Sequence, residues 1–245
     1  MVDSEDLLIC VACGTQFDIP ADKPPKGCRI CDDPRQFIPP GGQTWTSLSK
    51  MRAGNYQNKF KPVGESNGEE SMTSIWTEPK FGIGQRAIFV AGTHLEWAKV
   101  FECPVFVAKD DEEWLNRADA DGRRILFAAA SEEVEEGVTA VKTGGHSPGG
   151  FFVTTPSALY HIDRLPGTTS YAFMWAVPNM IPLPPAELHK MWQAIKPFEF
   201  ESTHGAFVGQ EVRAKEVKGR VLESMKIQTK DMGWEEHAVL KESWP

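Results

Sequence analysis

Four of the five cysteines form two short pairs near the beginning of the chain, Cys10-x-x-Cys13 and Cys28-x-x-Cys31. Each pair can present two thiolates from one tight turn, and two pairs complete the tetrahedral four-sulfur shell that Zn²⁺ adopts. Their separation is close to the roughly 15 to 20 residues typical of zinc sites. Buried free thiols and a redox pair are the alternatives. Because four thiolates leave no open coordination position, the pattern predicts a structural zinc and not a catalytic one.

Three of the six histidines, His94, His146 and His204, lie where predicted strands give way to turns or helices, which is where α/β folds gather their chemistry. His146 lies in the glycine-rich turn 144–150, and His204 precedes Gly205. Three imidazoles can hold one zinc ion with water as the fourth ligand, which lowers the pKa of that water to about 7 and makes a hydroxide nucleophile. The alternative for each residue is an ordinary turn histidine that faces solvent.

Other polar residues are weaker candidates, namely His161, His189 and His237. Asp163 is either a carboxylate ligand or the ion-pair partner of the adjacent Arg164. Cys103 stands beside an apolar stretch, and this position predicts a core residue.

The elements that must position these residues alternate between strands and helices. Apolar runs predict strands over 86–90, 103–107, 124–129, 138–142 and 198–201. A capping box predicts a helix from Thr93, and the apolar positions Leu188, Met191, Trp192 and Ile195 predict another after Pro185. Val217, Val221 and Met225 mark a last helix. We expect irregular structure over 51–77, a turn over 132–137 and coil after Gly150, within a mixed α/β fold.

Composition limits the classes of protein to which the chain can belong. The 245 residues are 41% hydrophobic and 24% charged, with no apolar run of the roughly 20 residues that a membrane helix needs, so a membrane-spanning or disordered chain is not expected. The net charge of −8 argues against nucleic acid as the main partner. The acidic opening lacks the basic character of a leader, so we expect a cytoplasmic protein. Residues 1–42, rich in cysteine and proline, are predicted to be a separate small lobe ahead of a main domain over 43–245.

The histidine motifs resemble those of the metallo-β-lactamase superfamily. Thr143-Gly-Gly-His-Ser-Pro-Gly149 is similar to the second histidine motif of that family, and Ser202-Thr-His-Gly205 to the last one. The segment 93–98, which contains His94, is similar to the end of the first metal motif. The cysteine pairs, together with 164–170 and 179–185, resemble a fungal and bacterial subgroup with a zinc ribbon ahead of the hydrolase domain.

The resemblance implies a fold and a chemistry. The family fold is an αββα sandwich whose cleft binds one or two zinc ions that activate water for hydrolysis. Two departures are present: Val90-Ala-Gly-Thr93 replaces most of the H-x-H-x-D-H signature, and no aspartate occurs between Gly150 and Thr155, where the family's bridging aspartate is expected. The chain therefore resembles an incomplete sandwich that lacks one segment before His94 and another after Gly149.

The resemblance and its departures lead to two hypotheses about function. The first is a zinc-dependent hydrolase of a small-molecule substrate, with His94, His146 and His204 as the remaining ligands of a catalytic zinc. The second is a catalytically inactive zinc-ribbon scaffold, derived from such a hydrolase, that binds a protein partner through the ribbon. A nucleic-acid-reading ribbon is disfavoured by Asp32 and Asp33 beside Cys31.

Overall fold

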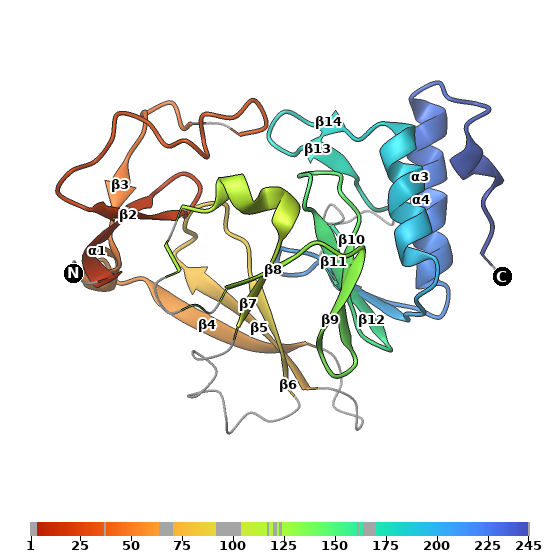
Figure 1. Ribbon diagram of the computed structural model, residues 1–245, viewed down its shortest axis with the longest axis horizontal. Coiled ribbons are helices and arrows are strands. Elements are labelled where there is room, and N and C mark those ends of the chain that lie inside the picture. The colour runs from red at the N-terminus through yellow and green to blue at the C-terminus, as the bar shows by residue number, and fades with distance from the viewer. Residues whose placement is uncertain are drawn as a thin grey trace. The chain divides into compact units, whose positions relative to one another are not determined.

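The computed structural model describes residues 4–36, 38–63, 71–91, 104–116, 118–119, 122, 124–160, 162–163 and 170–244. The chain divides into two compact units, one formed by Met1–Val105 with Trp114–Arg124 and the other by Phe106–Glu113 with Ile125–Pro245 (Figure 1). The coarse prediction of a mixed α/β fold is confirmed. The predicted boundary at residue 42 stays a prediction. No helix in the described ranges is long and apolar enough to cross a membrane.

The first unit contains the cysteine lobe and a second small sheet. The lobe sheet has the order β2-β1-β3, and its core packs Leu8 and Phe17 against three of the cysteines. The other sheet has the order β4-β5-β6. The elements are β1 (Leu7–Cys10), β2 (Gln16–Pro20), β3 (Trp45–Thr46), α1 (Leu48–Ala53), β4 (Gln57–Val63), β5 (Ser71–Glu78), β6 (Ala87–Ala91) and a 3₁₀ helix over Ser4–Asp6.

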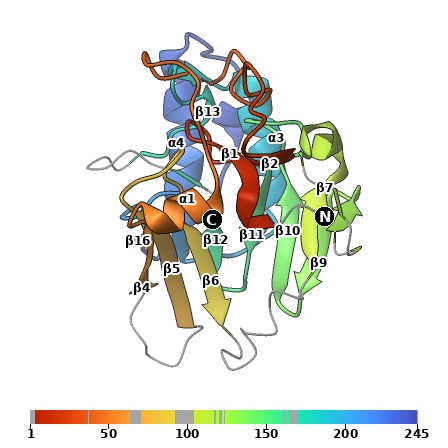
Figure 2. The same ribbon diagram turned by 90° about the vertical axis from the view of Figure 1, so that its left-hand side faces the viewer.

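A six-stranded sheet of order β16-β15-β12-β11-β10-β9 organises the second unit. Figure 2 shows β9 to β12 side by side. Neighbouring strands are antiparallel except β12 and β15, which are parallel. The strands that lie wholly or mainly in this unit are β7 (Val105–Ala108), β8 (Arg124–Phe127), β9 (Ser131–Glu135), β10 (Val138–Lys142), β11 (Phe151–Thr154), β12 (Ala158–Tyr160), β13 (Met174–Ala176), β14 (Ile181–Pro182), β15 (Ser202–His204) and β16 (Val212–Arg213).

Two helices, α3 (Pro185–Ile195) and α4 (Val217–Asp231), pack with this sheet around the main core. Successive strand residues face opposite sides of a sheet. In β11, Phe152 joins the core with the helices, whereas Phe151 joins a smaller cluster with Phe127 of β8. Two further segments, Lys109–Trp114 and Ala238–Lys241, form 3₁₀ helices.

Several local expectations need correction because strand pairing overrides weak sequence patterns. Residues 51–77, expected to be irregular, contain β4 and nearly all of β5, which pair from Gln57 with Glu78 to Val63 with Met72. The acidic stretch expected to be a turn contains β9, and the coil expected after Gly150 contains β11, β12 and β13. Strand β15 occupies Ser202–His204, which we expected to be a turn after a strand over 198–201. The helix expected from Thr93 lies outside the described residues, as does Cys103.

Candidate metal centre and candidate histidine site

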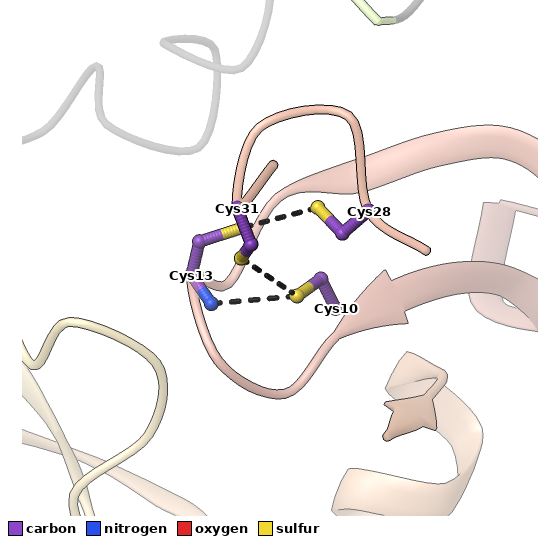
Figure 3. A group of neighbouring side chains, drawn as sticks. All are labelled: Cys10, Cys13, Cys28 and Cys31. Atoms are coloured by element: carbon purple, nitrogen blue, oxygen red, sulfur yellow. Dashed lines mark hydrogen bonds between the residues drawn. The ribbon is translucent and has the colours of Figure 1, made fainter. Parts of the chain in front are cut away.

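The four cysteines of the lobe come together at one point (Figure 3). Their sulfur atoms all lie within 4.8 Å of one another, with 3.6 Å between those of Cys10 and Cys31 and 3.8 Å between those of Cys13 and Cys28. Sulfurs bound tetrahedrally to zinc at about 2.3 Å would lie about 3.8 Å apart. The sequence prediction that these cysteines are placed to bind one metal ion is confirmed, and the spacing fits zinc, whose identity stays a prediction.

Local backbone geometry explains why the first cysteine pair converges. Cys10 ends β1, and its carbonyl accepts a 2.8 Å hydrogen bond from the Gly14 amide. Gly14 has a φ of +82°, which favours glycine. A Cβ atom on Gly82 would lie 3.0 Å from the Gly14 nitrogen, so the chain near Gly82 also packs closely on this turn.

Hydrogen bonds and burial shift the pKa values of the cysteine thiols. The hydrogen bond with Cys13 is the main cause that lowers the pKa of Cys10, to about 4, whereas burial raises the pKa of Cys31 to about 12. The side-chain amide of Gln43 also donates to the Cys10 sulfur at 3.2 Å. Gln43 lies one residue beyond the predicted lobe, residues 1–42, and the cysteine spacing gave no indication that it contacts the quartet. These hydrogen bonds favour the thiolate form of Cys10, which is the form that binds a metal ion.

The histidine site depends on one edge of the six-stranded sheet. Strands β10 and β12 are both antiparallel to β11, and β12 is parallel to β15, so all three end at the same edge. His146 follows β10, Asp163 follows β12, and His204 is the last residue of β15. This edge therefore carries two imidazoles and a carboxylate. His94, the third predicted ligand, lies outside the described residues.

His204 is buried at the end of its strand. Its ring stacks on Tyr160, its partner in the parallel register, with ring centres 5.0 Å apart. Its Nε2 lies 3.2 Å from the Ser202 hydroxyl. The carboxylate of Asp163 accepts a 2.7 Å hydrogen bond from the Ala206 amide, and a Cβ atom on Gly205 would lie 2.6 Å from the same oxygen. Gly205 thus allows Asp163 to lie directly against the turn that follows His204.

Asp163 follows a pair of strands that the sequence did not predict. After the turn 144–150, where we expected coil, the structure has the antiparallel pair β11 and β12, with Asp163 three residues beyond β12. The signal for Asp163 was present in the sequence, but its neighbour Arg164 offered an equally simple ion pair.

His146 is exposed, and its turn is held by main-chain and side-chain contacts. Its Nδ1 lies 2.8 Å from the carbonyl oxygen of Trp175. Because a carbonyl can only accept, Nδ1 carries a proton, and in the neutral ring Nε2 carries the lone pair. This is the arrangement in which metal-binding histidines are usually fixed. Sequence spacing gave no sign of this contact, because its acceptor is a main-chain atom.

The described residues contain one tight group of three or more metal-binding side chains, the cysteine quartet. The edge that carries His146, Asp163 and His204 does not form such a tight group. His189 and His237 lie elsewhere, the first beside Glu242 and the second capping a 3₁₀ helix. His161 lies outside the described residues.

Comparisons with known proteins give one informative match. No family model matches the chain, and no solved structure matches it. The chain is similar to the uncharacterized protein YmaE of Bacillus subtilis (strain 168), with 29% identity over an alignment of 252 positions, gaps included, which covers 81% of this chain and 88% of YmaE. The alignment is longer than the whole 245-residue chain, so YmaE contains residues that have no counterpart here.

Proposed function

We propose that the protein is a zinc-dependent hydrolase related to the metallo-β-lactamase superfamily, with a structural zinc at Cys10, Cys13, Cys28 and Cys31 and a second zinc at the histidine edge. The observation that carries this proposal is the common direction of β10, β12 and β15, which brings His146, Asp163 and His204 to one edge of one sheet. Two imidazoles and a carboxylate are a donor set found in catalytic zinc sites.

Each side chain at the edge has a defined role in this proposal. Zinc, when bound, would supply a hydroxide nucleophile near neutral pH for the hydrolysis of an ester, thioester or amide, because it lowers the pKa of water. His146 offers the Nε2 lone pair, because Trp175 holds the proton on Nδ1. Asp163 offers its carboxylate, which the hydrogen bond from the Ala206 amide orients. His204 can bind the metal through Nδ1. To bind it through Nε2, His204 must first break the contact between Nε2 and the Ser202 hydroxyl. His94 is the proposed further ligand.

A catalytically inactive zinc-ribbon scaffold is the second candidate. It is favoured by the absence, within the described ranges, of a second tight group of metal-binding side chains. In this alternative, the cysteine centre folds the lobe, and the lobe surface binds a protein partner.

Metal counting separates the two candidates. Protein purified with zinc and dialysed without chelator is analysed for zinc per chain, next to a His146→Ala/His204→Ala variant. The hydrolase proposal predicts close to two zinc ions for the parent protein and one for the variant. A ratio of one for both proteins would refute the catalytic site and leave the scaffold. A Cys10→Ser/Cys13→Ser variant should lose the other ion, which checks that the first zinc sits in the lobe.

A further inference from the structure

The turn that carries His146 is a compact structure between β10 and β11. The amides of Thr143 and Gly144 both donate to the carbonyl of Gly150 at 2.9 Å, and the Gly150 amide donates to the Ser147 carbonyl at 3.0 Å. A Cβ atom on Gly150 would lie 2.6 Å from the Gly144 oxygen. These bonds close the ends of the turn, but they do not involve the His146 side chain.

A side chain from a separate element holds the middle of this turn. One carboxylate oxygen of Asp111, in the 3₁₀ helix Lys109–Trp114, accepts a 2.8 Å hydrogen bond from the Gly149 amide. The other accepts a 2.8 Å bond from the Ser147 hydroxyl. A Cβ atom on Gly149 would lie 2.6 Å from the carboxyl carbon of Asp111, so glycine is needed for this approach. Asp111 thus binds the residue directly after His146 and the residue three positions after it.

The opposite side of the turn rests on the β13–β14 hairpin. The Trp175 carbonyl accepts from the His146 ring, and a Cβ atom on Gly145 would lie 3.1 Å from Leu183, which follows β14. Gln228 of α4 holds the base of the hairpin, because its amide group donates to the carbonyls of Phe173 and Leu183 at 3.1 Å. The ring of His146 therefore contacts a fixed carbonyl only while its own turn keeps its position.

We propose that Asp111 is a positioning residue for His146: its paired hydrogen bonds to Ser147 and Gly149 hold the turn where the imidazole meets the Trp175 carbonyl. The consequence is a single tautomer of His146, with Nε2 offered as a ligand. The metal-binding part of this inference rests on the proposed function. The tautomer and the turn geometry do not, since both exist without metal.

Variants at position 111 distinguish positioning from general stability. Asp111→Ala removes both acceptors. Asp111→Asn keeps the shape, can accept from the Gly149 amide, and can donate to the Ser147 hydroxyl, so it is the conservative rescue. Glu112→Ala is the matched control, because Glu112 is an exposed acidic residue of the same 3₁₀ helix.

The first readouts need no metal. Nitrogen-15 NMR of the His146 ring, at a pH where the ring is neutral, should show a protonated Nδ1 in the parent protein, in Asp111→Asn and in Glu112→Ala. Asp111→Ala should shift the ring towards a mixture of tautomers, and its Gly149 amide should exchange with solvent about tenfold faster. An unchanged tautomer in Asp111→Ala would overturn the proposal. If Asp111→Ala fails to fold, Ser147→Ala, which loses one of the two bonds, should show the same change with smaller amplitude, and its absence would equally overturn the proposal.

Cobalt titration of the zinc-loaded protein then tests the link to the proposed function. Asp111→Ala should bind the second ion about 10- to 100-fold more weakly than the parent protein, with Asp111→Asn near the parent. Equal affinities in all variants would overturn the role of Asp111 in metal binding. If the parent protein itself binds no second ion, the proposed function fails, whereas the tautomer result still decides whether Asp111 positions His146.

Discussion

At the scale of single residues, the two candidate sites differ in how much of each is local in sequence. The four cysteines come from two turns, and spacing alone predicted that they meet. The residues that support them do not follow from spacing. Gln43 donates to Cys10 across more than thirty positions, and the carboxylate of Asp111 accepts from a turn that lies more than thirty positions later. Such contacts depend on the fold, so a sequence pattern predicts the ligands but not the groups that orient them.

Gln43 provides the first prediction at this scale. Replacing it by alanine removes the amide that donates to the Cys10 sulfur, and we expect the lobe zinc to be held about 10-fold less tightly, as is usual when a supporting hydrogen bond to a ligand is lost. Competition with a coloured chelator measures the affinity. Gln36→Ala, in the same lobe, is the control. Equal zinc affinity for Gln43→Ala and the parent protein would show that the bond contributes nothing.

At the scale of elements, α3 was predictable and β15 was not. The apolar positions of α3 recur with helical period, and Leu188, Met191, Trp192 and Ile195 are all buried as predicted. Strand β15 is the sequence Ser-Thr-His, which has no apolar residue and resembles a turn. It is buried because it pairs with β12 on one side and β16 on the other. Its neighbours, and not its own residues, make it a strand.

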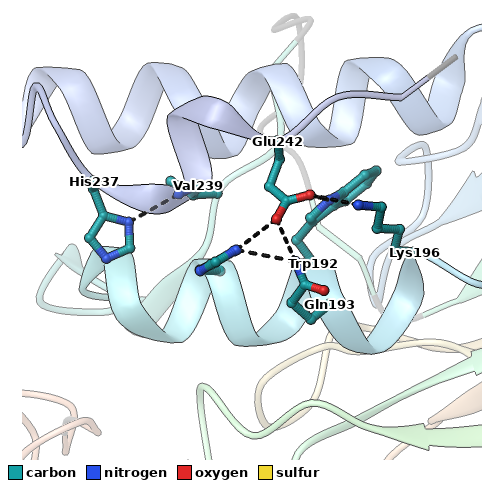
Figure 4. Close-up of polar contacts among 7 residues, drawn as sticks. Trp192, Gln193, Lys196, His237, Val239 and Glu242 are labelled. Carbon is teal, nitrogen blue, oxygen red and sulfur yellow. Dashed lines mark hydrogen bonds and ion pairs between the residues drawn. The ribbon is translucent and has the colours of Figure 1, made fainter.

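The C-terminal segment, which follows α4, contacts α3 through the carboxylate of Glu242 (Figure 4). One oxygen of Glu242 accepts from His189 at 2.9 Å and from Gln193, and the other accepts from Lys196 at 2.8 Å and from Trp192 at 3.2 Å. His189, Trp192 and Gln193 lie on one side of α3, and Lys196 is the residue that caps the C-terminus of this helix. The Lys196 and His189 hydrogen bonds lower the pKa of Glu242 to about 2.

This carboxylate predicts a pH-dependent contribution to stability. Because the pKa of Glu242 is lower in the folded protein than its ordinary value of 4.5, its contribution is complete above pH 4.5 and is lost as the pH falls towards 2. Glu242→Gln should lower the free energy of unfolding by about 1 kcal/mol at pH 7, since Lys196 is half exposed and water weakens the pair.

Urea denaturation at pH 7 and pH 3 measures this difference. We expect the gap between Glu242→Gln and the parent protein to be smaller at pH 3. Glu235→Gln, at an exposed position of the same segment, should change neither value. A difference in the free energy of unfolding that stays constant with pH would mean that these contacts do not depend on the charge of Glu242.

At the scale of the whole molecule, the two compact units depend on different forces. The core of the second unit joins sheet and helices through many large apolar side chains. The core of the cysteine lobe is small, and three of its five buried members are cysteines. A core of that size usually needs a metal or a cross-link to remain folded.

Chelation should therefore act on the two units unequally. After zinc is removed with a chelator, we expect amides of β1, β2 and β3 to lose protection against hydrogen exchange, whereas amides of β10, β11 and β12 keep it. Exchange followed by mass spectrometry resolves the two regions. Simultaneous loss of protection in both would contradict this independence, and unchanged exchange in the lobe would show that it folds without metal.

The parallel pairing of β12 with β15 makes the histidine edge sensitive to strand alignment. In the observed alignment, Tyr160 lies opposite His204, and their rings stack. A slip of one residue would turn the imidazole to the other face of the sheet. A slip of two residues would keep the face but replace the aromatic neighbour. Deletions inside β15 should therefore abolish whatever the imidazole does, because they change the residue that lies opposite Tyr160.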